Sequence, residues 1–379
     1  MHIPLSKPHI PKKVFENINQ VFASGKLSGD GTFCHSTEEK LKNILNVKHV
    51  LLTSSCTHAL EMSMLLLDGK EGDEVILPSF TFTSTANAIL VAGLKPVFCE
   101  IDPKTFNIDI NDVLKKITSK TIAVIPVHYA GVACDMEKLL EICRPRNIKI
   151  VEDAAHAIGA KWNNTYLGTI GDMGCLSFHD TKNVICGEGG AFLTNDDSLA
   201  EKAMIIREKG TNRSQFLKGQ VDKYTWVAKG SSYILAEPLA AILSAEVDIM
   251  FELNAKRGII HHYYYDTLKT LEEKNILTLP FLPNYAETNY HLFYIVLNSQ
   301  EQRNSLMSHL RNKGIGATFH YIPLHSAPLG IELGNKPNDL TNTEEYHSRL
   351  LRLPLYPDME RKDYETVASE IMTWAQKFN

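Results

Sequence analysis

The feature that most constrains the fold is a regular alternation of short apolar segments with helical patterns between about Lys48 and Thr194. Each apolar segment has the length of a strand and is rich in Val, Ile and Phe. Several are apolar almost throughout, which is typical of strands covered on both faces. The segments are HVLLT (49–53), DEVILP (73–78), KPVFCEID (95–102), TIAVIPVHY (121–129), IKIVEDAA (148–155), GCLSFH (174–179) and GGAFLT (189–194).

Between these segments lie stretches with apolar residues at helical spacing, such as THALEMSMLLL (57–67), STANAILVAG (84–93) and DMEKLLEICRPR (135–146). Repetition of strand, helix and strand predicts an α/β fold with a doubly wound, mostly parallel sheet. Ligands of such sheets bind beyond the carboxyl ends of the strands. The residues that follow each strand are therefore the candidates for a functional site.

After Ala236 the pattern changes to apolar residues at steps of three and four over residues 237–274. This spacing predicts one very long helix, or two helices joined end to end. The helix would link a large lobe to a smaller C-terminal α/β lobe. We therefore expect two domains, residues 1–250 and residues 251–379.

Composition excludes several classes of protein. The net charge is −5 with no basic block, so a nucleic-acid surface is not indicated, and no apolar run approaches the ~20 residues that cross a membrane. The seven cysteines are odd in number and form no CxxC pair, which favours reduced thiols in a cytoplasmic protein. We expect no metal site, since His261 and His262 are adjacent on a helix and point apart.

Polar residues follow two of the predicted strands. Asp153 and His156 end one strand, and Ser177 and Lys182 end the next, just before the glycines of GEGG (187–190). Glycines permit close approach of the backbone to a ligand. Each feature alone has an ordinary explanation, because acids cap helices, lysines are usually solvated and surface hairpins use glycine.

Two further strand ends add to this set. Cys56 and Thr57 stand where a strand enters a helix, and the free N–H groups of a helix start form a phosphate site. Phe82 follows another strand, where an aromatic ring either packs in the core or stacks on a planar ligand. A lysine, a carboxylate, a phosphate cradle and a stacking group are together the requirements of pyridoxal 5'-phosphate (PLP).

Several motifs in the chain resemble the DegT/DnrJ/EryC1/StrS family of sugar aminotransferases, which have the fold type I architecture of aspartate aminotransferase. The similarity runs from SGKLSGDGTF to RLPLYP, and SFHDTKN with GEGG is specific to the family. PVHYAGVACDM, REKGTNRSQFLKGQVDKYTW with GSSY, and FHYIPLH are similar to the transaminases that make dTDP-4-amino-4,6-dideoxygalactose.

The resemblance implies a reaction and an assembly. The enzyme would use PLP to move an amino group from glutamate to C4 of dTDP-4-keto-6-deoxy-D-glucose. The axial (galacto) product would serve a cell-surface polysaccharide, such as a lipopolysaccharide O-antigen or enterobacterial common antigen. The family also implies a homodimer with shared active sites.

By motif position, the resemblance assigns roles to residues of this chain. Lys182 would form the Schiff base with PLP, and Asp153 would pair with the ring nitrogen. The backbone N–H groups of Cys56 and Thr57, with the Ser177 hydroxyl, would hold the phosphate. Phe82 and Ala155 would cover the two ring faces. His156 stands where the family often has glutamine, and either side chain can bond the 3-hydroxyl oxygen.

A second departure concerns the phosphate. Many members have an asparagine that reaches the phosphate from the partner subunit, and this chain has Ile234 at that position. Because isoleucine donates no hydrogen bond, Ser231 or Ser232 would have to supply the contact; we assign it to Ser232.

The segment 211–226 is our candidate for binding the sugar nucleotide. It carries Arg213, Lys218 and Tyr224 with a single acid, and long loops in compact domains are commonly functional. Arginine suits a diphosphate because its planar fork bonds two oxygens. The alternative is a solvated surface loop. From the small lobe we expect three residues at the substrate: His320, Tyr321 and His325.

Other functions remain to be weighed. An aminotransferase of another keto-sugar nucleotide, or one giving the equatorial product, would use the same groups. Related PLP-dependent sugar dehydratases have histidine in place of Lys182, and a non-catalytic relative would have lost the lysine or the acid. A nicotinamide dehydrogenase is disfavoured because no G-x-G-x-x-G opens the first helix of the sheet.

Overall fold

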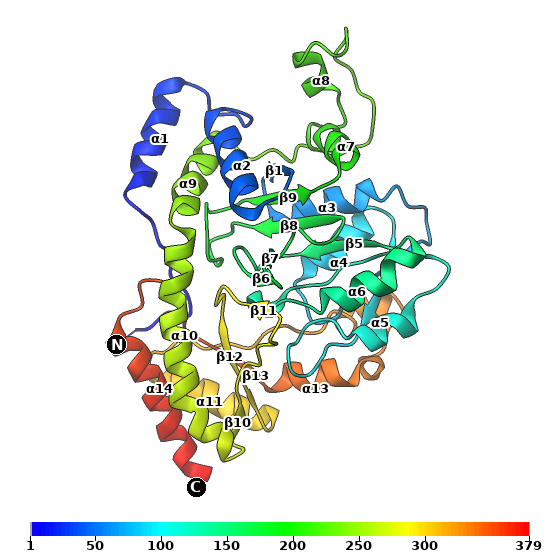
Figure 1. Ribbon diagram of the computed structural model, residues 1–379. Helices are drawn as coiled ribbons and strands as arrows, with labels where there is room; N and C mark the ends of the chain where they lie inside the picture. The colour runs from blue at the N-terminus through cyan, green and yellow to red at the C-terminus, as the bar shows by residue number, and fades with distance from the viewer. Residues whose placement is uncertain (1, 379) are drawn as a thin grey trace.

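The computed structural model describes residues 2–378, and its centre is a seven-stranded sheet (Figure 1). β9 pairs antiparallel with both of its neighbours, and the other adjacent pairs are parallel. The prediction of a mostly parallel sheet is confirmed, and each predicted segment contains one of its strands or overlaps it closely. In spatial order the strands are β1 (His49–Thr53), β9 (Gly190–Thr194), β8 (Met173–Ser177), β5 (Lys149–Asp153), β4 (Thr121–Val124), β2 (Glu74–Pro78) and β3 (Lys95–Cys99).

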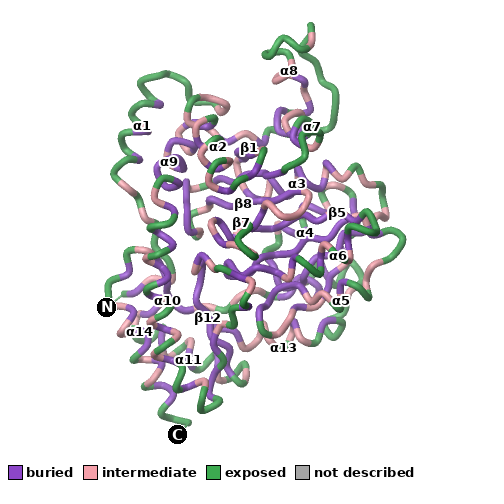
Figure 2. The backbone as a smooth tube through the Cα atoms, viewed as in Figure 1, coloured by how far each residue is buried: buried purple, intermediate pink, exposed green. Residues whose placement is uncertain are grey.

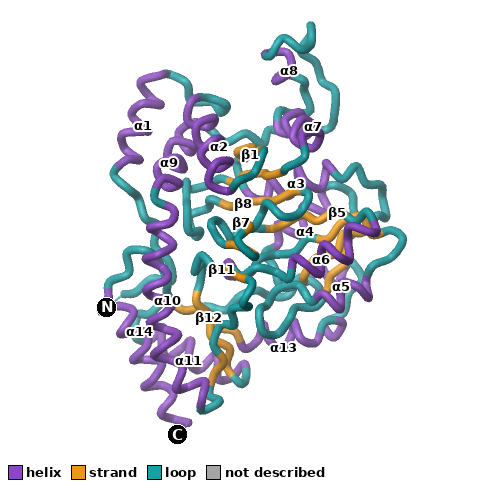
Figure 3. Tube along the Cα trace, viewed as in Figure 1, coloured by secondary structure: helices purple, strands orange, loops and turns teal. Residues whose placement is uncertain are grey.

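Helices cover both faces of this sheet (Figure 3). Side chains alternate along a strand, so Val75 and Leu77 of β2 pack on one face and Ile76 on the other. The first face is covered by α3 (Cys56–Leu66), α4 (Thr83–Val91) and α7 (Asp197–Arg207). The opposite face is covered by α2 (Thr32–Leu45), α5 (Ile110–Lys116), α6 (Met136–Cys143) and α9 (Glu237–Asp248).

Two helices joined end to end connect the large sheet to the rest of the chain. α9 ends at Asp248 and α10 (Met250–Glu273) begins two residues later. Of the two predicted forms, one very long helix or two helices joined end to end, the second is therefore correct. The backbone of Ile249, with φ −114° and ψ 11°, interrupts the helical geometry. α1 (Lys13–Ser24) lies beside α9 in Figure 1.

The C-terminal part has a core of its own around Tyr264, Phe293 and Trp374. We propose the predicted boundary, between residues 250 and 251, as the start of this smaller lobe, because α10 supplies much of the core. Its remaining elements are β10 (Leu277–Thr278), β12 (Phe293–Leu297), α11 (Gln300–Asn312), α12 (Pro328–Glu332), α13 (Thr341–Arg349), β13 (Leu350–Leu353) and α14 (Arg361–Ala375). A small sheet of β11 (Ala286–Glu287), β6 (Lys161–Trp162) and β7 (Thr165–Tyr166) joins the two parts.

One segment stands away from the body of the molecule. The short helix α8 (Arg213–Leu217) and the chain around it project beyond α7, and residues 218–232 are almost all exposed (Figure 2). Within residues 2–378, no helix combines the length and the apolar character that crossing a bilayer requires.

Candidate active site

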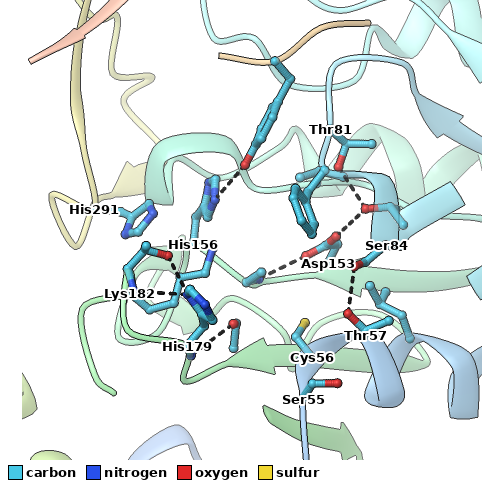
Figure 4. Close-up of a pocket in the computed structure, with 18 of the residues that line it drawn as sticks. Ser55, Cys56, Thr57, Thr81, Ser84, Asp153, His156, His179, Lys182 and His291 are labelled. Carbon is cyan, nitrogen blue, oxygen red and sulfur yellow. Dashed lines mark hydrogen bonds between the residues drawn. The ribbon is translucent and has the colours of Figure 1, made fainter. Parts of the chain in front are cut away.

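A cavity of about 650 Å³ opens where β5 and β8 end, and residues of the small lobe complete its wall (Figure 4). This is the edge at which the sequence places the candidate site. Of the residues predicted from the sequence, those that line the cavity are Cys56, Thr57, Phe82, Asp153, Ala155, His156, Ser177, Lys182, His320 and Tyr321.

Lys182 lies in the turn after β8, where its backbone N–H donates to the His179 carbonyl at 2.9 Å. Within the described part of the chain, its Nζ amine has no hydrogen-bond or ion-pair partner. Burial lowers the pKa of this amine to about 8, and the charge of Arg352 acts in the same direction. The amine is therefore far more nucleophilic near neutral pH than an exposed lysine.

Asp153 is the last residue of β5 and is buried. Its Oδ2 accepts a hydrogen bond from the Thr85 hydroxyl at 2.8 Å, and its Oδ1 accepts one from the Ala155 N–H at 3.1 Å. Burial raises the pKa of this carboxyl group, and these two hydrogen bonds and Lys182 oppose that shift. A carboxylate held in this way suits a cationic partner inside the cavity.

The start of α3 forms another part of the wall. Ser55 caps the helix by accepting from the His58 N–H, and Cys56 and Thr57 are its first two residues. The N–H groups of these two residues have no intrahelical acceptor because they lie in the first turn. A Cβ at Gly190 would lie 2.4 Å from the Cys56 nitrogen, so this glycine lets β9 approach the helix start closely. An eleven-residue helix with free N–H groups facing a cavity favours an anion there.

Aromatic and small side chains line other parts of the wall. Phe82 precedes α4 and is 60% exposed, and its ring centroid lies 6.4 Å from that of Tyr321. Ala155 is partly exposed to the cavity. His156 is buried, its Nε2 lies 3.3 Å from the Tyr321 hydroxyl, and burial holds its pKa well below the ordinary value.

The structure adds residues that the sequence did not single out. Thr85 lies next to Asp153, and His291 lies with its ring centroid 4.3 Å from that of His156. Arg352 of β13 reaches the same cavity. The RLPLYP motif contains Arg352, but the motif gives no indication that this side chain lines the same cavity as Lys182.

His325 does not reach the cavity. Its side chain is fully buried, with Nδ1 2.7 Å from the Ser79 hydroxyl and Nε2 3.2 Å from the Pro337 carbonyl oxygen. Both ring nitrogens are therefore engaged in holding residues 323–337 against the end of β2. This position leaves no ring nitrogen free for a substrate.

The predicted binding loop does not line this cavity. Arg213 forms an ion pair of 2.9 Å with the buried Glu208, and Lys218 and Tyr224 are exposed in the projecting segment. Ser232 is exposed and pairs with Glu208 in an isolated bridge. Ile234 pairs with Thr53, the last residue of β1, just before the start of α3.

The residues around the cavity fit PLP as a set. An unpaired amine, a buried carboxylate, a helix start with free N–H groups and an exposed aromatic ring match the aldehyde, ring nitrogen, phosphate and ring face of this cofactor. A backbone that leaves room only for glycine at residue 190 supports the same assignment.

Comparison with known proteins supports this conclusion. A model of the DegT/DnrJ/EryC1/StrS aminotransferase family matches residues 8–372. The uncharacterized protein MJ1066 of Methanocaldococcus jannaschii is 33% identical over 341 residues, which is 88% of each chain. Aminotransferase TlmJ of Streptoalloteichus hindustanus is 31% identical and covers 99% of both chains with a TM-score of 0.91. Helicobacter pylori PseC, an aminotransferase involved in the biosynthesis of pseudoaminic acid, is 25% identical over the whole of both chains with a TM-score of 0.92.

The fold, the cavity and these similarities define a PLP-dependent aminotransferase of fold type I. The chain belongs to the DegT/DnrJ/EryC1/StrS family of sugar aminotransferases. The family and the fold class expected from the sequence are thereby confirmed.

Proposed function

We propose that this enzyme transfers the amino group of glutamate to C4 of dTDP-4-keto-6-deoxy-D-glucose and forms dTDP-4-amino-4,6-dideoxy-D-galactose. The observation that carries the proposal is the unpaired, half-buried amine of Lys182 in one cavity with Asp153. The nucleotide, the keto position and the axial product come from the sequence resemblance. The product would be consumed in assembling a cell-surface polysaccharide, and we place the enzyme in the cytoplasm.

We assign the cofactor contacts to residues around the cavity. The N–H groups of Cys56 and Thr57, with the Ser177 hydroxyl, bind the phosphate. Phe82 and Ala155 contact the two faces of the ring. The close spacing of Gly190 and Cys56 supports this placement, because it keeps the helix start against the end of the sheet.

When bound, PLP supplies an electron sink for the bond changes at the carbon that gains or loses nitrogen. Asp153 holds a proton on the ring nitrogen, and Thr85 orients its carboxylate. The Lys182 amine moves a proton at the reacting carbon, for which a pKa of about 8 is well suited. We assign the bond to the 3-hydroxyl oxygen to His156, whose pKa burial holds well below its ordinary value, so that its ring is neutral.

We propose further that two copies of the chain share their active sites. The projecting segment around α8 carries Arg213, Lys218 and Tyr224 away from its own cavity (Figure 1). In a homodimer these side chains would serve the sugar nucleotide of the partner, and Ser232 would contact its phosphate. Sedimentation of the active enzyme tests the assembly, since a fully active monomer would contradict it.

Two alternatives involve the same cavity. An enzyme for another keto-sugar nucleotide, or for the equatorial amine, would use the same residues and differ only in the shape of the substrate pocket. A sugar dehydratase is disfavoured because Lys182 stands where the related dehydratases have histidine.

The decisive experiment is to incubate the enzyme with PLP, glutamate and dTDP-4-keto-6-deoxyglucose and to determine the product by NMR. We expect an axial amine at C4. An equatorial amine would correct the stereochemistry, and loss of the C3 hydroxyl without a new amine would indicate dehydration. A parallel incubation with the UDP-linked sugar tests the choice of nucleotide.

A further inference from the structure

Asn183, the residue after Lys182, has a buried side chain that joins the two lobes. It is 4% exposed, and its Nδ2 donates at 2.8 Å both to the Asn289 carbonyl oxygen and to Oδ1 of Asn254 in α10. Its Oδ1 lies 2.8 Å from Nδ1 of His291. Three hydrogen bonds of one amide therefore tie the turn that carries the lysine to the long helix and to the segment that leads into β12.

The partners of Asn183 are themselves held in place. Asn289 is buried, and its Nδ2 donates at 2.9 Å to the carbonyl oxygen of His156, which follows β5. Arg257 of α10 donates to the carbonyl oxygen of His291. A buried network of this kind is rigid, because breaking one bond leaves a polar group unpaired away from water. The turn after β8 is therefore anchored to elements on both sides of the cavity.

The same amide fixes the tautomer of the His291 ring. A backbone carbonyl only accepts, so the bond to Asn289 identifies Nδ2 of Asn183 and leaves Oδ1 as an acceptor. Nδ1 of His291 is therefore the donor. Burial holds the pKa of His291 well below its ordinary value, so the ring is neutral and Nε2 carries the lone pair. This ring lines the cavity beside His156 (Figure 4).

We propose that Asn183 is a positioning residue for Lys182, whose amine it keeps in the buried part of the cavity by anchoring the turn after β8. This rests on the proposed role of Lys182 as the residue that carries the cofactor. The two residues are adjacent, so any movement of the Asn183 anchor shifts the backbone from which the lysine side chain starts.

The charge state of Lys182 reports where the turn places its amine. Burial is the largest influence on the pKa of this amine and lowers it to about 8. A looser turn would admit water and reduce this effect. The titratable and charged groups that also act on the amine or feel its charge lie on other elements: Cys56, Asp153, His156, His291 and Arg352.

The pH dependence of PLP capture by the cofactor-free enzyme tests the proposal. Asn183→Leu keeps the size of the side chain and removes its three hydrogen bonds. We expect the midpoint of capture, followed by borohydride trapping, to rise from about 8 by roughly one pH unit or more towards that of an exposed lysine. Asn17→Leu is the matched control, because Asn17 is equally buried and donates to the Ala241 carbonyl of α9. It should lower the Tm without moving the midpoint.

A second position decides the question if Asn183→Leu does not fold. Asn254→Leu removes one of the three bonds and should raise the midpoint by less than Asn183→Leu does. Asn254→Asp keeps an oxygen that accepts from Asn183 and should stay close to wild type. The side-chain ¹⁵N signals of His291 should show one tautomer in the wild type and in Asn254→Asp, and both tautomers in Asn183→Leu.

Two results would overturn the proposal. One is a midpoint that neither Asn183→Leu nor Asn254→Leu moves, and the other is a midpoint that Asn17→Leu moves as far as they do. Trapping of PLP on a different lysine of the wild-type enzyme is a separate failure. It would refute the proposed role of Lys182 and remove the basis of this inference with it.

Discussion

The hydroxyl of Thr85 donates a 2.8 Å hydrogen bond to Oδ2 of Asp153, although the two residues come from different elements. Thr85 lies in the first turn of α4, and its Oγ1 is also 2.9 Å from the Thr81 hydroxyl. The carboxylate is thereby held in one orientation at the end of β5. The pKa of the Asp153 carboxyl group therefore depends on the neutral hydroxyl of Thr85.

Replacing Thr85 with valine keeps the shape and removes the hydrogen bond. Because that bond favours the charged carboxylate, its loss should raise the pKa of Asp153 further and weaken its hold on the ring nitrogen. We expect kcat to fall about tenfold, equivalent to ~1.4 kcal/mol. Thr85→Ser, which keeps the hydroxyl, is the control and should stay close to wild type. A Thr85→Val enzyme with normal kcat would show that Ala155 alone suffices to hold the carboxylate.

Asp153→Asn should lose most activity while retaining the cofactor. The amide cannot stabilise a protonated ring nitrogen, and a charge-assisted pair of this kind contributes a few kcal/mol. We expect kcat to fall by at least about a hundred-fold, as ~2.7 kcal/mol implies. The absorbance of bound cofactor separates this effect from cofactor loss. Near-normal kcat would mean that another group holds the ring nitrogen.

Lys182→Ala should abolish transamination and leave the fold intact. Among residues 2–378, Lys182 is the lysine that lines the cavity. Its replacement by alanine therefore removes the amine to which we assign the cofactor. Turnover, and the fraction of PLP that borohydride fixes to the protein, measure the effect. Lys202→Ala, in an exposed turn of α7, is the control and should behave as wild type. More than trace turnover by Lys182→Ala would contradict the assignment of Lys182 as the residue that forms the Schiff base with PLP.

Capture of PLP by the cofactor-free enzyme should depend on pH through Lys182. The reactive form is the neutral amine, and burial lowers its pKa to about 8. The capture rate should therefore rise with pH through about 8 and level off above it. Borohydride trapping at a series of pH values gives the midpoint. A midpoint near the ordinary value for lysine would show that the amine is more hydrated than its position indicates.

Arg213→Ala and Lys218→Ala test the projecting loop. If the loop binds the diphosphate of the partner's substrate, each change should raise KM for the sugar nucleotide about tenfold or more, and KM for glutamate much less. Arg213 also pairs with Glu208, so Glu208→Gln serves as the control for loss of that ion pair alone. Equal effects on both substrates, or none, would identify the segment as an ordinary surface loop.

The sequence predicts the parts of the site that depend on strand ends. Asp153 and Ser177 terminate neighbouring parallel strands, and Lys182 follows the second of them. Since parallel strands end at one edge of a sheet, periodicity alone brings these residues together. His325 shows the limit of this reasoning. It lies in an irregular segment, where no repeat indicates direction, and its side chain is engaged by Ser79.

The sequence by itself determined the fold class, the succession of buried strands along the chain and the family, because local apolar spacing and contiguous motifs are enough to identify each of them. Only the tertiary structure decided which side chains complete the cavity. Thr85 reaches Asp153 through the packing of α4 on the sheet, and Arg352 comes from a strand of a different sheet. The physical reason is that such contacts depend on how separate elements pack against one another. The spacing of residues along one segment does not indicate how that segment packs against another.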